Sequence, residues 1–172
     1  MTGLALTTFV LLIHACSACT GGWHSFHHGG PCFKVFHESG ISWNQANSRC
    51  RGMGTVLAQV SDHSTHTHLI NLISSDYSSG FFMIGATNWH GSWTWNNLGS
   101  SLPYGDTYWL PGQPDNYCAP HHTCHEGQHC VAYTNKNGHG HWGWDDITCS
   151  VDNYDGYICE KNADGYSGPL VG

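Results

Sequence analysis

Nine cysteines are the feature that most constrains what this chain can fold into. In an oxidising compartment cysteines pair as disulfides, and an odd number leaves one without a partner. Removal of an N-terminal segment that includes Cys16 would leave eight, which is enough for four bridges. Counting alone leaves the pairing open, because eight cysteines allow many connectivities. The alternative is a zinc cluster of Cys and His ligands, which secretion would disfavour.

The start of the chain has the features of a signal peptide. Residues 4–13 are apolar but too few to span a bilayer, and the small residues Cys16, Ser17 and Ala18 follow. We therefore expect residues 1–18 to be removed and the product to be secreted and extracellular. No later apolar run is long enough to span a membrane. We expect one domain over residues 19–161 and a flexible tail over residues 162–172.

Composition excludes one class of partner. The formal net charge is −7, with 5 basic and 12 acidic residues, so the chain has no basic surface for a phosphate backbone. Nucleic acid is therefore not an expected partner. Eight Trp, eight Tyr and 22 Gly favour a loop-rich fold built from short elements.

Apolar residues at helical spacing predict two helices. The first covers residues 43–51, with Ser42 as its N-cap and Gly52 at its end. The second covers residues 62–74, and either Ser61 or Asp62 could cap it. Its other face carries three histidines, His63, His66 and His68.

Apolar runs and alternating patterns predict short strands that close antiparallel sheets. We expect a hairpin over residues 19–36 and strands over residues 81–86, 92–95, 130–133, 141–144 and 157–159. Residues 98–117 show no periodicity, but their tryptophan and prolines indicate an ordered long loop. Loops of this kind commonly carry function.

Oxygen-bearing side chains gather in two short segments. Gln113 and Asp115 flank Pro114, and Asp145 and Asp146 follow about thirty residues later. A hard cation such as Ca²⁺ prefers carboxylate and amide oxygens of this kind. If the Gln113–Pro114 bond is cis, both flanking side chains could face one ion. The two segments together predict a calcium site.

The order of these motifs resembles the carbohydrate-recognition domain of C-type lectins. The resemblance is carried by Gln-Pro-Asp at 113–115, Trp-Asp-Asp at 144–146 and Tyr-Ile-Cys-Glu at 157–160, with Cys130 and Cys149 between them. It implies an α+β fold of two helices, antiparallel sheets and a long calcium- and sugar-binding loop, stapled by disulfides. It also implies the pairs Cys50–Cys159, Cys130–Cys149 and Cys19–Cys32, which leaves Cys118 to pair with Cys124.

The resemblance assigns roles to individual residues. It implies that Gln113, Asp115, Asp145 and Asp146 bind Ca²⁺ and also hydrogen-bond sugar hydroxyls. Gln128 stands where the family has a carboxylate ligand, and Glu126 could replace it only if the loop bulges by two residues. Asp145 stands where the family usually has Asn, so a side chain that donates is replaced by one that only accepts. Tyr117, with Trp142 as a second candidate, could contact the apolar face of a sugar, and Trp144 is expected to be structural.

Gln-Pro-Asp accompanies galactose and N-acetylgalactosamine in the family that the chain resembles. We therefore expect a secreted, calcium-dependent lectin for glycans with these terminal sugars, and no enzymatic activity. Its binding should be lost as pH falls from about 7 to about 5, because protons compete with calcium for the carboxylates. A homo-oligomer would have to use the domain surface or the tail. Innate immune recognition is one of several roles that such a lectin could serve.

Other interpretations remain open at this stage. A domain of the same fold could bind protein or mineral surfaces without reading sugar, and Gln128 and Asp145 favour that alternative. Residues 125–129 match the H-E-x-x-H pattern of zinc proteases, but a central glycine and flanking cysteines favour a loop over a helix. The histidines could bind zinc or copper or sense pH, although scattered solvated side chains are the simpler interpretation. An auxiliary calcium site is weakly supported, since Asn88 and His90 stand where acidic ligands would be expected.

Overall fold

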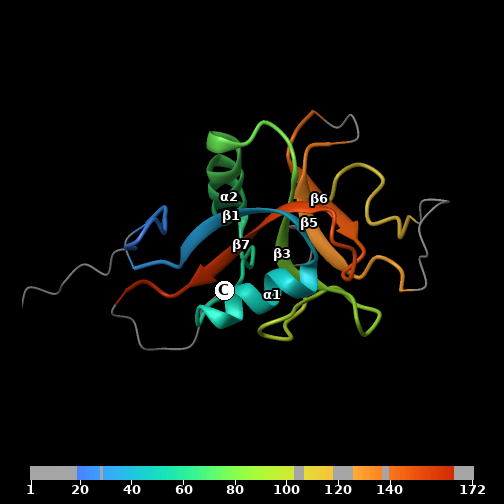
Figure 1. Cartoon of the computed structure of the whole chain (residues 1–172), viewed down its shortest axis with the longest axis horizontal. Helices are drawn as coiled ribbons and strands as arrows, with labels where there is room; N and C mark the ends of the chain where they lie inside the picture. Colours follow the sequence, from blue (N-terminus) through green and yellow to red (C-terminus); the bar gives the residue numbers. More distant parts are fainter. Residues whose placement is uncertain (1–18, 28, 103–106, 118–125, 137–139, 165–172) are drawn as a thin grey trace, which may run out of the picture.

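The computed structural model describes residues 19–27, 29–102, 107–117, 126–136 and 140–164, drawn in colour in Figure 1. The predicted signal peptide and the pair Cys118–Cys124 lie outside these residues, as does most of the predicted tail. Within the described residues, no helix combines the length and apolar character needed to cross a bilayer.

One mixed sheet forms the centre of the fold, with the main order β1-β7-β3-β5-β6. Two short strands extend it, since β2 pairs with β7 and β4 pairs with β3. The bounds are β1 Cys32–Ile41, β2 Val56–Leu57, β3 Phe81–Thr87, β4 Thr94–Trp95, β5 Cys130–Thr134, β6 Gly143–Ile147 and β7 Tyr154–Lys161. All ladders between these strands are antiparallel except the β3–β7 pair, which is parallel and which the sequence patterns did not indicate.

The close packing of β7 between β1 and β3 depends on one glycine. A Cβ atom at Gly156 would lie 2.2 Å from the carbonyl oxygen of Phe36 and 3.0 Å from the ring of Phe82. Only a residue without a side chain allows both neighbours to approach this closely.

The helix α1, Trp43–Gly52, begins with a reciprocal capping box. Ser42 Oγ accepts from the Gln45 backbone N–H at 3.3 Å, and Gln45 Oε1 accepts from the Ser42 N–H at 2.9 Å. The predicted inward residues Trp43, Ala46 and Cys50 are all buried. They pack with Met83 and Ala132 against one face of the sheet.

The helix α2, His63–Asp76, is capped by Asp62, which accepts from the Thr65 N–H at 2.7 Å. Of the two predicted cap residues, Asp62 is therefore the one in use. Leu69 and Ile73 are buried against Phe82 and Tyr133, which belong to the second hydrophobic cluster. Because neighbouring residues of β3 and β5 divide between the two clusters, α1 and α2 cover opposite faces of the sheet (Figure 1).

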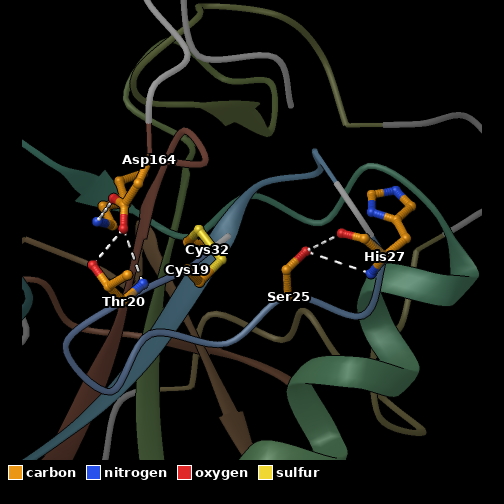
Figure 2. Close-up of a disulfide and its surroundings, with 7 residues drawn as sticks. Cys19, Thr20, Ser25, His27, Cys32 and Asp164 are labelled. Carbon is orange, nitrogen blue, oxygen red and sulfur yellow. Dashed lines mark hydrogen bonds and ion pairs between the residues drawn. A yellow bond between two sulfur atoms is a disulfide. The ribbon is translucent and has the colours of Figure 1, made fainter. Parts of the chain in front are cut away.

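Three predicted disulfides are confirmed. Cys50–Cys159 joins α1 to β7, and Cys130–Cys149 joins the start of β5 to the segment after β6. Cys19–Cys32 holds the first described residues against β1. Figure 2 shows that Thr20, beside this bridge, also bonds to Asp164 near the other end of the described chain.

Two predicted strand positions are wrong. The predicted hairpin over residues 19–36 is reduced to one bridge, between His24 and Phe33. Its expected second strand is the first part of β1, which continues to Ile41 and pairs with β7. The strand predicted at 141–144 is displaced to Gly143–Ile147 and therefore contains both aspartates of the Trp-Asp-Asp motif. This displacement places the motif inside the sheet, where burial raises the pKa of both aspartates.

Candidate functional site

The long loop is attached to the sheet along β6. Trp144 of β6 makes two backbone hydrogen bonds to the loop. Its N–H donates to Tyr108 O at 2.7 Å, and its carbonyl oxygen accepts from the Leu110 N–H at 2.9 Å. Leu110 is buried, and its carbonyl accepts from the Gln113 N–H at 2.9 Å. This turn places Gln113 beside the strand that carries Asp145 and Asp146.

Asp146 fixes the position of the Gln-Pro-Asp segment. Its Oδ1 accepts from the Asp115 N–H at 3.0 Å, and its Oδ2 accepts from the Asn116 N–H at 2.8 Å. Asp146 is 1% exposed, and burial is the largest cause that raises its pKa, while these two hydrogen bonds oppose it. One buried carboxylate therefore joins two motifs that lie about thirty residues apart in sequence.

Asn116 joins the same loop to the segment before β5. Its backbone has a positive φ of 49°, a conformation that Asn tolerates better than most residues, and its Oδ1 accepts from the Gln128 N–H at 2.7 Å. Gly127 permits this contact, because a Cβ there would lie 3.0 Å from the same Oδ1. Asn116 was not predicted as a site residue. Its position directly after Asp115, where a tight turn needs an αL residue, is the signal that could have identified it.

Two glutamine oxygens lack partners beside this junction. The Oε1 atoms of Gln113 and Gln128 are both buried and accept no hydrogen bond within the described part of the chain. A buried acceptor without a partner costs roughly 1–3 kcal/mol, so such atoms indicate a group that binds there. Carbonyl oxygens are ligands that a hard cation prefers. The peptide bond between Gln113 and Pro114 is cis.

Asp145 is a buried carboxyl group close to two other carboxylates. The side chain is 7% exposed, and burial, followed by the charges of Asp146 and Asp115, raises its pKa to about 7. The three carboxylates thus lie close enough to repel one another. A divalent cation among them would remove that repulsion, so the donor set fits such an ion in charge as well as in ligand type.

The carboxylates alone do not form a closed metal site. Among the described residues, no three His, Cys, Asp or Glu side chains are grouped as metal ligands. A cation at this position would therefore depend on the amide oxygens of Gln113 and Gln128 together with the aspartates.

The remaining predicted site residues differ in accessibility. Tyr117 is 61% exposed at the end of the described loop, and its N–H donates to Asp115 Oδ1 at 2.9 Å. Glu126 is exposed, whereas Gln128 is half-buried with its oxygen enclosed. Trp142 packs edge-on against Phe82 at 5.9 Å, so part of its ring belongs to the core. Trp144 is fully buried, which confirms its structural role.

The protease-like segment is not helical where it is described. Glu126 lies in a bend, and Gln128 and His129 precede β5 without helical hydrogen bonding. His125 lies outside the described residues. The geometry that the zinc-protease pattern needs, two histidines on one helical face, is therefore not formed by residues 126–129.

The histidines of α2 are less solvated than expected. His66 stacks on Tyr108 at 3.6 Å and shares a 2.8 Å hydrogen bond with the hydroxyl of Tyr133, and burial lowers its pKa to about 4. His68 packs against Phe26 and Phe33, and burial lowers its pKa as well. Only His63 of the three is exposed. The interpretation as solvated side chains is therefore wrong for His66 and His68, which extend the core.

Comparison with known proteins identifies the fold and the family. The family described as Lectin C-type domain matches residues 39–161. C-type lectin domain family 10 member A of Rattus norvegicus is 30% identical over 112 residues, which is 65% of this chain and 34% of that protein. The chain thus spans about a third of the length of the curated relatives that it matches first.

Two solved structures show the same architecture. The mouse scavenger receptor C-type lectin carbohydrate-recognition domain superposes with a TM-score of 0.66 at 22% identity, covering 86% of this chain and 99% of that one. A structure described as the SPL-1–GlcNAc complex gives 0.65 at 25% identity, with coverages of 83% and 94%. These likenesses confirm the expected α+β fold, and with the family match they lead to one conclusion: this chain belongs to the C-type lectin domain family.

Proposed function

We propose that this chain is a secreted lectin that binds terminal galactose or N-acetylgalactosamine in a calcium-dependent manner. Membership of the family supports carbohydrate binding in general, and the Gln-Pro-Asp order at residues 113–115 supports the galactose type. The observation that carries the proposal is the pair of buried glutamine oxygens, Gln113 Oε1 and Gln128 Oε1, without partners beside the loop that Asp146 fixes. Those atoms need a partner, and a hard cation supplies it.

We assign the cation to oxygens of five residues, Gln113, Asp115, Gln128, Asp145 and Asp146. Bound there, Ca²⁺ would supply open coordination positions for two adjacent sugar hydroxyls. Glu126 is not in the set, because its side chain is exposed while the amide oxygen of Gln128 is enclosed and unpaired. Between Gln128 and Glu126, we therefore propose Gln128 as the ligand.

The same side chains read the hydroxyls. When Gln113 Oε1 faces the cation, its NH₂ group is left to donate to one hydroxyl, while Asp115 can only accept from another. Asp115 Oδ1 already accepts from Tyr117 N–H, so its second oxygen is the one available to sugar. Asp145 also only accepts, which removes a donor that Asn would offer. Tyr117, largely exposed, can lie against the apolar face that an axial 4-hydroxyl leaves open.

A single site of this kind binds weakly, because each hydrogen bond to sugar replaces one to water. Useful avidity would then come from several domains acting together.

Retention on immobilised galactose tests the proposal. The protein should be retained in calcium and released by a chelator, and a Gln128→Ala variant should lose retention while Glu126→Gln keeps it. The double variant Gln113→Glu, Asp115→Asn should shift preference toward mannose, because it exchanges the donor and the acceptor. An unchanged sugar ranking in that variant would show that these two side chains do not read the hydroxyls.

A second candidate function is binding of protein or mineral surfaces without sugar recognition. The substitution of Asp for the usual Asn at position 145 favours it, since it adds a third carboxylate beside Asp115 and Asp146 and removes a sugar donor. Calcium binding without retention on any sugar column would support this candidate over the lectin.

A further inference from the structure

We infer that His66 of α2 is a positioning residue for the proposed cation site, and that it acts through Tyr108 near the start of the long loop's second described part. The His66 ring stacks on the Tyr108 ring, with the ring centroids 3.6 Å apart and the ring planes at 10°. This inference rests on the proposed function, because it names a residue that orders the loop of the same site.

Backbone hydrogen bonds connect Tyr108 to the proposed ligands in three steps. The Tyr108 carbonyl oxygen accepts from the Trp144 N–H at 2.7 Å, and the Trp144 carbonyl oxygen accepts from the Leu110 N–H at 2.9 Å. The Leu110 carbonyl oxygen then accepts from the Gln113 N–H at 2.9 Å. Because Trp144 directly precedes Asp145 on β6, a displacement of Tyr108 would move Gln113 relative to that aspartate.

His66 is itself fixed to the sheet. Its Nδ1 shares a 2.8 Å hydrogen bond with the hydroxyl of Tyr133, a fully buried residue of β5. Burial, followed by the charge of His63, lowers the pKa of His66 to about 4, so the imidazole is neutral at pH 7. A neutral imidazole has one donor and one acceptor nitrogen, and the bond to Tyr133 uses one of them to hold the ring plane. The stacked Tyr108 ring follows that plane.

The rings of these residues form one aromatic cluster. Trp144 meets Tyr108 edge-on at 5.3 Å and Tyr133 edge-on at 6.2 Å, and its side chain is fully buried. His66 therefore joins α2 to the loop, to β5 and, through the cluster, to β6. Because packed interiors contain few voids, removal of the His66 ring would leave space next to Tyr108 into which the loop could move.

A second histidine of α2 distinguishes positioning from simple packing. His68 is half-buried like His66, and burial lowers its pKa as well. It packs against Phe26 and Phe33, which lie in the N-terminal part of the fold and not in the long loop. A contribution to stability alone would therefore be shared by the two histidines, whereas a contribution to the proposed site would belong to His66.

Calcium titration by calorimetry tests the inference. His66→Ala should raise the calcium dissociation constant about fivefold, the loss expected from an aromatic pair that no longer favours the ordered loop. His68→Ala is the matched control and should leave that constant unchanged, although it removes a packed ring from the same helix. His66→Phe keeps the stack on Tyr108 and should bind calcium within about twofold of the wild type. His66→Gln removes the ring but keeps a hydrogen-bonding group, and it should weaken binding as His66→Ala does.

A double substitution tests whether His66 acts through Tyr108. The variant that combines His66→Ala with Tyr108→Ala should bind calcium no more weakly than Tyr108→Ala alone, because the second change finds the stack already lost. Losses of binding free energy that add in the double variant would overturn the inference, since His66 would then act independently of Tyr108.

Amide hydrogen exchange in a chelator measures the order of the loop without calcium. The amides of Leu110 and Gln113 should exchange about fivefold faster in His66→Ala than in His68→Ala, because only the first substitution frees the loop. Equal exchange at these amides in the two variants, or an equal loss of calcium affinity in both, would overturn the inference by reducing His66 to a packing residue. A wild type that binds no calcium would remove the proposed function, whereas faster exchange of the loop amides in His66→Ala would still support the positioning of the loop.

Discussion

Replacement of Asp145 by Asn should stabilise the calcium-free protein, although it removes a charged residue from the proposed site. The side chain is 7% exposed, and burial, with the charges of Asp146 and Asp115, raises its pKa from 3.8 to about 7. A carboxyl with a raised folded-state pKa contributes stability that is fully present below pH 3.8 and is lost as pH rises through about 7. Asn has nearly the same size but does not ionise, so the variant does not lose this stability as pH rises.

The magnitude follows from the two pKa values. One pKa unit corresponds to about 1.4 kcal/mol, so the full difference corresponds to roughly 4 kcal/mol above pH 7. Residual solvent around the carboxylate screens part of this free energy. We therefore expect about half of it, near 2 kcal/mol, as the stabilisation. The gain in unfolding free energy should therefore be about 2 kcal/mol at pH 8 and should approach zero near pH 4.

Urea unfolding in a chelator, followed by tryptophan fluorescence at both pH values, measures this difference. Asp152→Asn, at an exposed position, is the matched control and should change little at either pH. Saturating calcium should reduce the advantage of the Asp145→Asn variant, because the ion stabilises the charged side chain of the wild type. A variant no more stable than the wild type at pH 8, or equally stabilised at pH 4, would refute the reasoning.

Three further outcomes are expected. Galactose retention in calcium should weaken as pH falls from about 7 to about 5, since the pKa of Asp145 near 7 means that protons then compete with the cation; full retention at pH 5 would count against it. Ser42→Ala should lower the free energy of unfolding by about 1 kcal/mol by removing the α1 cap, whereas the exposed helical Ser48→Ala should change it by less than about 0.5 kcal/mol in urea unfolding. Glu160→Gln should raise the free energy of unfolding by about 3 kcal/mol at pH 8 and by nearly nothing near pH 4. Burial raises the pKa of Glu160 to about 7, so the wild type loses stability as this carboxyl ionises with rising pH, whereas Gln does not ionise. Equal gains at both pH values in urea unfolding would contradict this.

Local signals in the sequence predicted the helices well. Ser42 with Gln45 three residues later is a capping box, and the spacing of Trp43, Ala46 and Cys50 identifies the buried face of α1. Both depend on residues close in sequence, whose contacts the helical geometry determines. The choice between Ser61 and Asp62 as cap of α2 could not be made in this way, since either oxygen could reach the first free N–H groups.

The strands were harder because their partners are remote. Residues 37–40 of β1 are polar or glycine and mostly exposed, so they lack the alternation that marks a strand. The strand is extended over them because both His37 and Ile41 pair with β7. The parallel contact of β3 with β7 joins segments more than seventy residues apart and leaves no local mark in either. His66 and His68 were misjudged for the same reason, as Tyr108 and Phe33 approach them from distant segments.

The candidate site was predictable in composition but not in organisation. Gln113, Asp115 and Asp146 are identified by motif, yet the hydrogen bonds that Asp146 accepts from the loop depend on a strand position that was placed too early in the sequence. The burial that raises the pKa of Asp145 follows from the same displacement.

A glycan array probed with and without calcium tests the central claim most directly. We predict binding confined to glycans with terminal galactose or N-acetylgalactosamine, present in calcium and absent after chelation. The same glycan profile in both conditions, or a calcium-dependent profile confined to mannose, would contradict it.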